Sequence, residues 1–233
     1  MSILIKNVTL LPMSGEGTIV NNAYVRIKGQ YISEVGTGNA PDGRDDLVID
    51  GSGQLLMPGF INTHTHAAMT LLRGYADDLP LMEWLETKIW PLEDQMNGDD
   101  IYAGTRLAIL EMIKSGTTCF ADMYFSMDRV AEAVRDTGMR AVLARGMVGV
   151  GPEHQQALDE SRELVANWHG AARGRIQFIL GPHAPYTCPP DYLKRVIALA
   201  EELDTGIHIH LAETAGEVSD IEKQQGKTPI ALM

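Results

Sequence analysis

Cysteine, aromatic residues and long apolar runs are all scarce in this chain. Only two of its 233 residues are cysteines, Cys119 and Cys188, which excludes a disulfide framework and a paired-cysteine metal site. Aromatic residues make up 6% of the chain against 45% for all hydrophobic residues, so aliphatic side chains and methionine must fill the core. No apolar run reaches the ~20 residues that span a membrane, and the N-terminus lacks the basic and apolar regions of a secretory signal. We therefore expect a cytoplasmic protein with no membrane partner.

Basic residues are also few. The 19 Lys and Arg residues face 31 Asp and Glu residues, for a net charge of -12. A surface this acidic repels phosphate backbones, so we expect no nucleic-acid partner. A neutral or zwitterionic small molecule is compatible with this charge, and the composition leaves a homo-oligomer open.

The first 57 residues carry strand patterns and no helical pattern. The β-rich runs YVRI and YISEV flank a Lys28-Gly29-Gln30 turn, which predicts a hairpin. A further short strand is expected around Val48. We interpret residues 1–57 as the N-terminal part of a small β-sandwich-like domain.

From Pro58 onward, short apolar runs alternate with helical patterns. The expected strands are GFINTHTH, GTTCFADMY, RAVLARGMVGV, RIQFILGPHAP and GIHIHLAET. The expected helices cover residues 80–115, 128–137, 154–172, 190–203 and 217 onward. This α/β alternation predicts a parallel sheet, and polar residues at the strand ends predict a (β/α)8 TIM-type barrel. Such a barrel typically needs about 250 residues. We therefore expect residues 58–233 to hold barrel strands 1–5, with both domains incomplete in this chain.

The sharpest chemical signal is the pair His64 and His66 at the end of the first expected barrel strand. Residues two apart in a strand face the same side, so both imidazoles should point into the barrel mouth. Imidazoles that converge at about 2.0–2.1 Å from one point are how proteins hold zinc. Two surface loop histidines are the alternative, but the position after the apolar run MPGFIN favours a metal site.

The fifth expected strand carries a second group, His208-Ile209-His210-Leu211-Ala212-Glu213. His210 lies nearer the carboxyl end, where barrel sites are found, so we expect it to be a third metal ligand. His208 is expected to be a packed and hydrogen-bonded core histidine. Glu213 comes where the strand turns into its loop, and we interpret it as a catalytic acid beside the metal. A carboxylate that stabilises a helix N-terminus is the alternative for Glu213.

His183 lies in Gly181-Pro182-His183-Ala184-Pro185, after the fourth expected strand. Two prolines fix the backbone around it, which suits a substrate-orienting group. A structural turn histidine is the competing interpretation.

Lysine is absent from the expected strand ends. Binuclear hydrolases of this architecture commonly bridge two metal ions with a modified lysine on a barrel strand. Since Lys114 and Lys194 both lie in helical patterns, the sequence favours one metal ion over two.

Four segments together resemble the amidohydrolase superfamily. They are MPGFINTHTHAAMTLLRGYADDLPLMEWLETKIWPLED, SGTTCFADMY, GPHAPYTC and HIHLAET. Within the superfamily they are most similar to the methylthioadenosine and S-adenosylhomocysteine deaminases, near the triazine chlorohydrolases. The resemblance covers the whole chain. It implies hydrolytic deamination of an adenine nucleoside (methylthioadenosine, S-adenosylhomocysteine or adenosine) to an inosine-type product and ammonia.

The resemblance also implies roles for individual residues. One divalent metal ion per subunit would be held by His64, His66 and His210, with Zn2+ favoured and Fe2+ left open. Glu213 would contact the base and shuttle a proton, and His183 would contact the substrate.

The resemblance also implies nucleoside contacts for two further residues. Glu93 of the WPLED segment would hold the ribose hydroxyls, and Arg145 near the end of the third expected strand would contact the nucleoside. A helix-surface acid and a strand-end ion pair are the respective alternatives.

The chain departs from the family pattern in its metal ligands. The family places a histidine after the sixth strand and a metal-binding aspartate after the eighth, and neither has a counterpart here. Asp122, after the second expected strand, should make local hydrogen bonds and not replace that aspartate. Two other functions stay open: a triazine-type amidohydrolase or chlorohydrolase, and a non-catalytic fragment that binds a metal or a nucleoside. Glu93 and Arg145 discriminate between the enzymes, because only a nucleoside offers them sugar-side groups.

Overall fold

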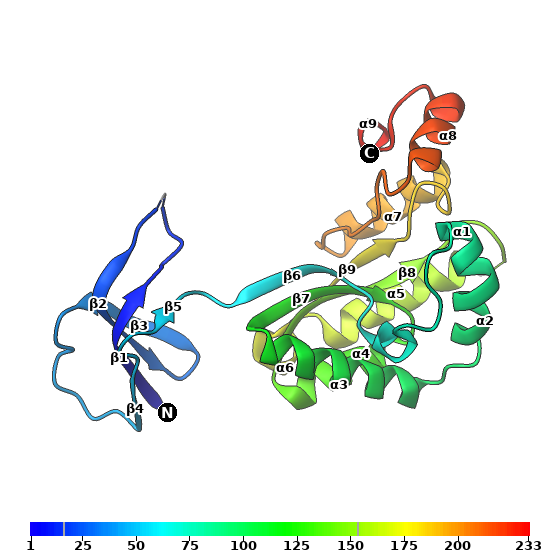
Figure 1. Ribbon diagram of the computed structural model, residues 1–233. Helices are drawn as coiled ribbons and strands as arrows, with labels where there is room; N and C mark the ends of the chain where they lie inside the picture. Colours follow the sequence, from blue (N-terminus) through cyan, green and yellow to red (C-terminus); the bar gives the residue numbers. More distant parts are fainter. Residues whose placement is uncertain (16, 153) are drawn as a thin grey trace. The chain divides into compact units, whose positions relative to one another are not determined.

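The computed structural model describes residues 1–15, 17–152 and 154–233, and it divides the chain into two units, Met1–Gly59 and Phe60–Met233 (Figure 1). The strands of the first unit are β1 (Ser2–Leu10), β2 (Val20–Lys28), β3 (Tyr31–Thr37), β4 (Leu47–Asp50) and β5 (Leu55–Leu56). They form one sheet in the order β3-β2-β1-β4, with β5 beside β1. The expected hairpin is confirmed, because β2 pairs antiparallel with β3 and Gly29 takes a positive φ of 63° in the turn.

The second unit contains a parallel sheet in the order β6-β7-β8-β9. Its described strands are β6 (Phe60–Thr65), β7 (Thr117–Tyr124), β8 (Arg140–Met147) and β9 (Ile176–Pro182). Helices α3 (Gly98–Lys114), α4 (Met127–Thr137) and α5 (His154–Trp168) cover one face of this sheet (Figure 1). Alternate strand residues such as Phe120, Leu143 and Phe178 are buried between the strands and those helices. All four carboxyl ends consequently lie at one edge of the sheet, as in a barrel.

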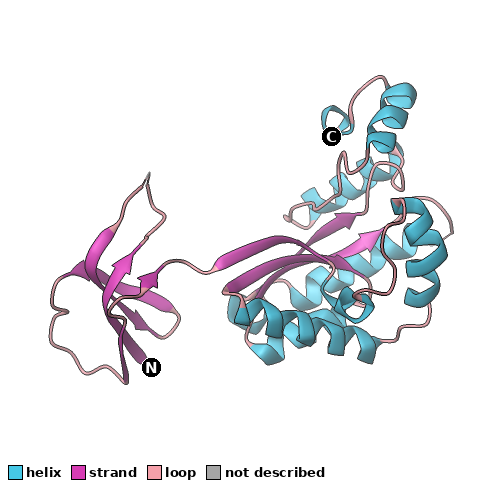
Figure 2. Ribbon diagram, viewed as in Figure 1, coloured by secondary structure: helices cyan, strands magenta, loops and turns pink. Residues whose placement is uncertain are grey.

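Helices and strands alternate along the second unit, as Figure 2 shows. The remaining described helices are α1 (Leu81–Trp84), α2 (Trp90–Glu93), α6 (Ala171–Gly174), α7 (Pro190–Glu202), α8 (Ala215–Gln225) and α9 (Pro229–Leu232). A 3-10 helix, η1 (Ala67–Leu72), follows β6, and a π-helical turn, η2 (Leu85–Ile89), joins α1 to α2. Among the described residues, no helix is both long enough and apolar enough to cross a membrane.

Three of the expected helices are interrupted. The helix expected from residue 217 onward ends at Gln225, because Gly226 takes a left-handed conformation (φ 68°), and a separate short helix, α9, follows. The region 80–115 breaks at Asn97, whose side chain accepts from the backbone N–H groups of Asp99 and Asp100 while Asp100 reaches back to the Asn97 N–H. This capping box starts a new helix, α3. The region 154–172 ends early, at Trp168, because Gly170 takes a left-handed conformation (φ 77°) that terminates a helix.

The expected fifth strand is not a regular strand. Residues 206–210 run parallel to β9 and form one isolated bridge, between Ile207 and Leu180. Backbone hydrogen bonds join His208 N to Leu180 O and His210 N to His183 O. Pro182 lies between those two acceptors and has no N–H to donate, so the ladder is interrupted there. The segment still delivers His210 to the carboxyl end of the sheet.

Gly104 lets α3 approach the segment that follows β6. A Cβ atom at this position would lie 2.5 Å from the carbonyl oxygen of Ala68, so no other residue fits without a shift of the backbone. The hydroxyl of Thr70 also donates to the Gly104 carbonyl at 2.8 Å. Close helix packing therefore fixes η1 directly behind the end of β6.

Candidate active site

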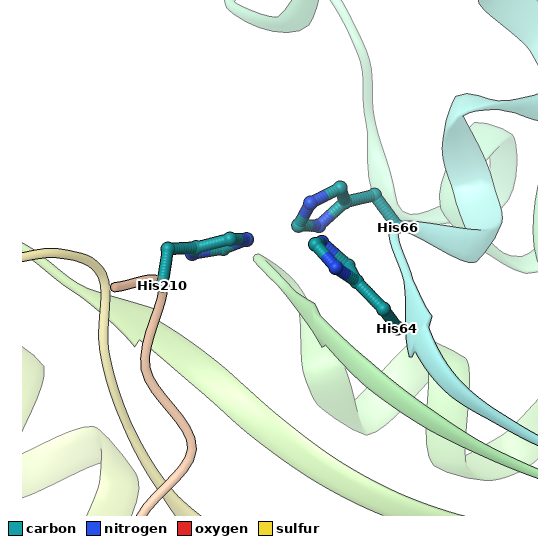
Figure 3. A group of neighbouring side chains, drawn as sticks. All are labelled: His64, His66 and His210. Atoms are coloured by element: carbon teal, nitrogen blue, oxygen red, sulfur yellow. The ribbon is translucent and has the colours of Figure 1, made fainter. Parts of the chain in front are cut away.

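Three imidazole rings converge at the carboxyl edge of the sheet. His64 and His66 come from the end of β6, and His210 comes from the segment beside β9 (Figure 3). One ring nitrogen from each lies within 4.8 Å of the other two. Donor atoms of a tetrahedral zinc site lie about 3.4 Å apart, so small side-chain rotations bring these nitrogens to coordination distance. The donor set therefore fits a divalent metal ion.

Backbone carbonyls fix the orientation of two of these rings. The Nδ1 atom of His66 lies 2.7 Å from the Met123 carbonyl oxygen, and that of His210 lies 2.9 Å from the His183 carbonyl oxygen. A carbonyl only accepts, so Nδ1 carries the proton and Nε2 keeps its lone pair. Burial also lowers the pKa of His66, which favours the neutral ring that binds metal. The Nε2 atoms of His66 and His210 are therefore unprotonated and able to bind a metal ion.

His183 lies against this cluster, with its ring centroid 5.1 Å from that of His210. Its Nδ1 is 3.0 Å from the Thr187 hydroxyl, which itself donates to the Ala184 carbonyl. The hydroxyl has one proton, so it accepts from Nδ1–H and leaves Nε2 of His183 as an acceptor. Burial, with His210 and His66 nearby, lowers the pKa of His183 to about 4. The ring is therefore neutral at neutral pH.

Glu213 lies at the edge of the same site, where the chain turns from the β9-side segment into α8. Ala212 takes a positive φ of 56° at this turn. The buried Glu217 carboxylate accepts from the backbone N–H groups of Ala212 (3.1 Å) and Glu213 (2.8 Å). Thr214 caps the helix by accepting from Glu217 N. The backbone that carries Glu213 is therefore held by Glu217 and Thr214 together.

Glu93 reaches the site from α2. The pocket-lining residues Leu81, Leu85, Ile89 and Glu93 are spaced four apart. A spacing of four drifts around a helix that has 3.6 residues per turn, and the wider π turn of η2 offsets part of that drift. All four side chains therefore stay on one face, and the hydroxyl of Tyr124 at the end of β7 donates to the Glu93 carboxylate.

A pocket of about 370 Å³ brings these groups together. Its polar lining consists of His64, His66, Glu93, Tyr124, His183, Tyr186, His210 and Glu213. Trp84, Leu85 and Phe125 contribute apolar walls that suit a planar ring. A larger hollow of about 670 Å³ lies beside it, but the described residues place no candidate metal cluster there.

Asp122 fixes the chain between the two β6 histidines and η1. Its Oδ1 accepts from the Thr65 hydroxyl and from Ala67 N, both at 2.8 Å. The expectation of local hydrogen bonding is confirmed. The carboxyl is fully buried, which raises its pKa to about 6, and it is not a member of the histidine cluster.

Arg145 does not reach the pocket. It shares a strand face with Leu143 and Met147, which are fully buried under the helices, so it points toward the helical layer. Its guanidinium binds Glu160 of α5 at 2.9 Å and lines a separate hollow of about 380 Å³. The strand-end ion pair is the interpretation that this geometry supports, and a nucleoside contact is not.

His208 is half-buried and lies outside the histidine cluster. No described residue is hydrogen-bonded to its ring. Its neighbour His210 is more deeply buried, with 8% exposed.

Comparison with known proteins identifies the fold and the family. A sequence model of the Amidohydrolase family matches residues 55–231. The chain belongs to the amidohydrolase family. The TIM-type α/β fold expected from the sequence is thereby confirmed, with the described part of this amidohydrolase carrying strands β6 to β9 and the segment beside β9.

Two curated relatives are highly similar to this amidohydrolase. A 5-methylthioadenosine/S-adenosylhomocysteine deaminase from Syntrophomonas wolfei subsp. wolfei is 64% identical over 231 residues, which cover 99% of this chain and 54% of the relative. A protein of the same name from Desulforamulus reducens is 56% identical, over 98% of this chain and 53% of its own length. This amidohydrolase thus spans about half the length of the curated relatives it matches.

Solved structures of two other proteins are also similar to this chain. An adenosine deaminase from Xanthomonas campestris with bound zinc is 34% identical, with a TM-score of 0.90 over 98% of this chain and 53% of that chain. An atrazine chlorohydrolase from Arthrobacter aurescens, complexed with zinc, has a TM-score of 0.88 over 99% of this chain and 57% of that chain. Because it is only 23% identical, the second likeness shows the fold alone.

The sequence analysis did not predict two residues of the site, Glu217 and Tyr124. The Thr214-x-x-Glu217 spacing is a capping-box pattern, from which Glu217 could have been predicted. Tyr124 had no such signal, because its partner Glu93 lies 31 residues away in an unrelated segment.

Proposed function

We propose that this amidohydrolase hydrolyses the bond between C6 and the amino group of an adenine nucleoside, giving an inosine-type product and ammonia. Methylthioadenosine, S-adenosylhomocysteine and adenosine are the candidate substrates. The observation that carries the proposal is the convergence of three imidazoles with Glu213 and His183 in one pocket. The substrate class is supported by the printed names of relatives that are 64% and 56% identical.

His64, His66 and His210 would hold one divalent metal ion, and we propose Zn2+, with Fe2+ as the alternative. Neutral imidazole nitrogen is a good ligand for zinc, and the carbonyl partners of His66 and His210 direct Nε2 toward the common centre. When bound, such an ion lowers the pKa of a coordinated water molecule to about 7, so that hydroxide is available at neutral pH. The absence of lysine from the strand ends favours a single ion.

Glu213 would act as the proton carrier. Replacement of an amino group on an aromatic ring requires a proton on the adjacent ring nitrogen, which makes the carbon electrophilic, and a proton on the departing ammonia. A carboxyl group at the edge of the pocket serves both steps if it is not a metal ligand. Glu213 is outside the three-histidine cluster and lines the pocket, which supports that role.

His183 and Glu93 would orient the nucleoside. His183 presents a neutral ring whose Nε2 accepts a hydrogen bond, next to the metal-binding histidines. Glu93 lines the same pocket and would accept from ribose hydroxyls. Arg145 has no part in the proposal, because its side chain is paired with Glu160.

Ammonia release is the direct test of this proposal. The protein from the complete reading frame, loaded with zinc, is assayed against adenosine, methylthioadenosine, S-adenosylhomocysteine and a chlorotriazine. We expect ammonia from at least one adenine nucleoside and no loss of chloride from the triazine. Chloride or amine release from the triazine alone would replace the proposal with the triazine-type activity. No product from any of the four, with the metal bound, would favour a binding protein without turnover.

A further inference from the structure

The carboxylate of Glu93 has an unusual environment for a helix side chain. It is half-buried and lines the pocket together with the apolar residues Leu85, Ile89 and Trp90. In the part of the chain that the structure describes, it has no salt bridge, and the Tyr124 hydroxyl is its one side-chain hydrogen-bond partner. Burial is the main cause that raises the pKa of this carboxyl. A group that is costly to bury and has a single partner is suited to binding a ligand.

Tyr124 is the residue that holds this carboxylate in place. It ends β7, the residue is 8% exposed, and its ring stacks on Phe125 with centroids 4.4 Å apart. A tyrosine hydroxyl has one proton, which it gives to Glu93 Oε1. The other oxygen, Oε2, has no hydrogen-bond partner among the described residues and remains available as an acceptor.

We propose that Tyr124 is a positioning residue that orients the Glu93 carboxylate toward the two sugar hydroxyls of a nucleoside, and thereby sets a preference for ribose over sugars without that diol. The inference rests on the proposed function, because it concerns the sugar side of the same substrate. It follows from a rigid strand end holding a carboxylate that otherwise sits on a short helix after a π turn. Without the hydroxyl, the carboxylate is free to rotate and its two acceptors lose their fixed direction.

The test is Tyr124→Phe, measured on the adenine nucleoside with the best turnover and on its 2′,3′-dideoxy counterpart. A hydrogen bond to a charged group contributes about 1.5–3 kcal/mol, so we expect KM for the ribonucleoside to rise about 10- to 100-fold with kcat little changed. KM for the dideoxy compound should be the same in the variant and the parent. Metal content should not change, because Tyr124 is not in the histidine cluster.

Tyr102→Phe is the matched control. The Tyr102 hydroxyl also donates to a carboxylate, that of Asp136 at 3.0 Å, but on the surface of α3 and α4 away from the pocket. This control should leave both KM values unchanged. An equal fall in kcat on both substrates in Tyr124→Phe would overturn the inference, because it would mean that Tyr124 acts on His66, 6.4 Å away between ring centroids. Unchanged kinetics in Tyr124→Phe would overturn it as well.

Binding separates this inference from the proposed function. If the parent releases no ammonia, the proposed function fails, and calorimetric titration with the ribonucleoside and its dideoxy counterpart still tests Tyr124. A preference for the ribonucleoside that Tyr124→Phe removes supports the inference. Equal affinities in the parent protein, or a preference that survives the substitution, contradict it.

Discussion

His210→Ala is expected to lose its metal ion, whereas His208→Ala should keep it. His210 contributes one of three converging nitrogens, and its Nδ1 is fixed by the His183 carbonyl. Loss of a hydrogen-bond partner of a metal ligand weakens metal affinity about 10- to 100-fold. Loss of the ligand itself should therefore weaken metal affinity more than about 100-fold. The measurement is metal content by elemental analysis, after dialysis of the zinc-loaded protein against buffer without metal.

The two variants are closely matched. Both replace a histidine by alanine in the same segment, two residues apart, and His208 lies outside the cluster. Circular dichroism checks that each variant is folded. Metal retained in His210→Ala but lost in His208→Ala would reverse the assignment of the third ligand, which was made from the position of His210 nearer the carboxyl end of the sheet. Retention in both would mean that the fifth segment contributes no ligand.

Glu213→Gln is expected to lower kcat about 100- to 10,000-fold, the range that a positioned proton carrier contributes, while metal content and KM stay close to those of the parent. The substitution keeps the size of the side chain and removes its ability to transfer a proton. Glu213 lines the pocket without joining the three histidines, so the metal site should be intact. Steady-state ammonia release together with elemental analysis measures both effects.

Glu222→Gln is the control for this experiment. Glu222 is an exposed glutamate on α8, and its loss should leave kcat unchanged. If Glu213→Gln keeps normal turnover, the proposed proton transfer is wrong, and Glu213 is a helix N-terminal carboxylate. If Glu213→Gln loses its metal along with its activity, Glu213 belongs to the ligand set.

Local patterns predicted the part of the site that depends on strand geometry. Parity alone places His64 and His66 on one side of β6, because side chains alternate in any strand. The same rule, applied to β8, indicates that Arg145 shares a face with Leu143 and Met147 and therefore points to the helices. The nucleoside contact transferred to Arg145 by family resemblance conflicts with that pattern, and the structure follows the pattern.

Contacts between segments that are distant in the sequence could not be predicted from local patterns. The Tyr124–Glu93 hydrogen bond depends on how α2 packs against the end of β7, and the position of Glu93 depends on a π turn that has no sequence signature here. The irregular segment that carries His210 follows from Pro182, whose missing N–H was visible in the sequence. The effect of this missing N–H on the ladder could not be predicted, because it depends on which residue of the segment 206–210 lies opposite Pro182.

We propose that hydrolytic deamination requires a metal ion held by His64, His66 and His210. This claim is tested most directly by measuring ammonia release from the preferred adenine nucleoside. The assay is run before the metal is removed with a chelator, after its removal, and again during zinc titration. We predict that ammonia release disappears with the metal and returns in full at one zinc ion per subunit. Full ammonia release by protein that elemental analysis shows to be free of metal would contradict the claim.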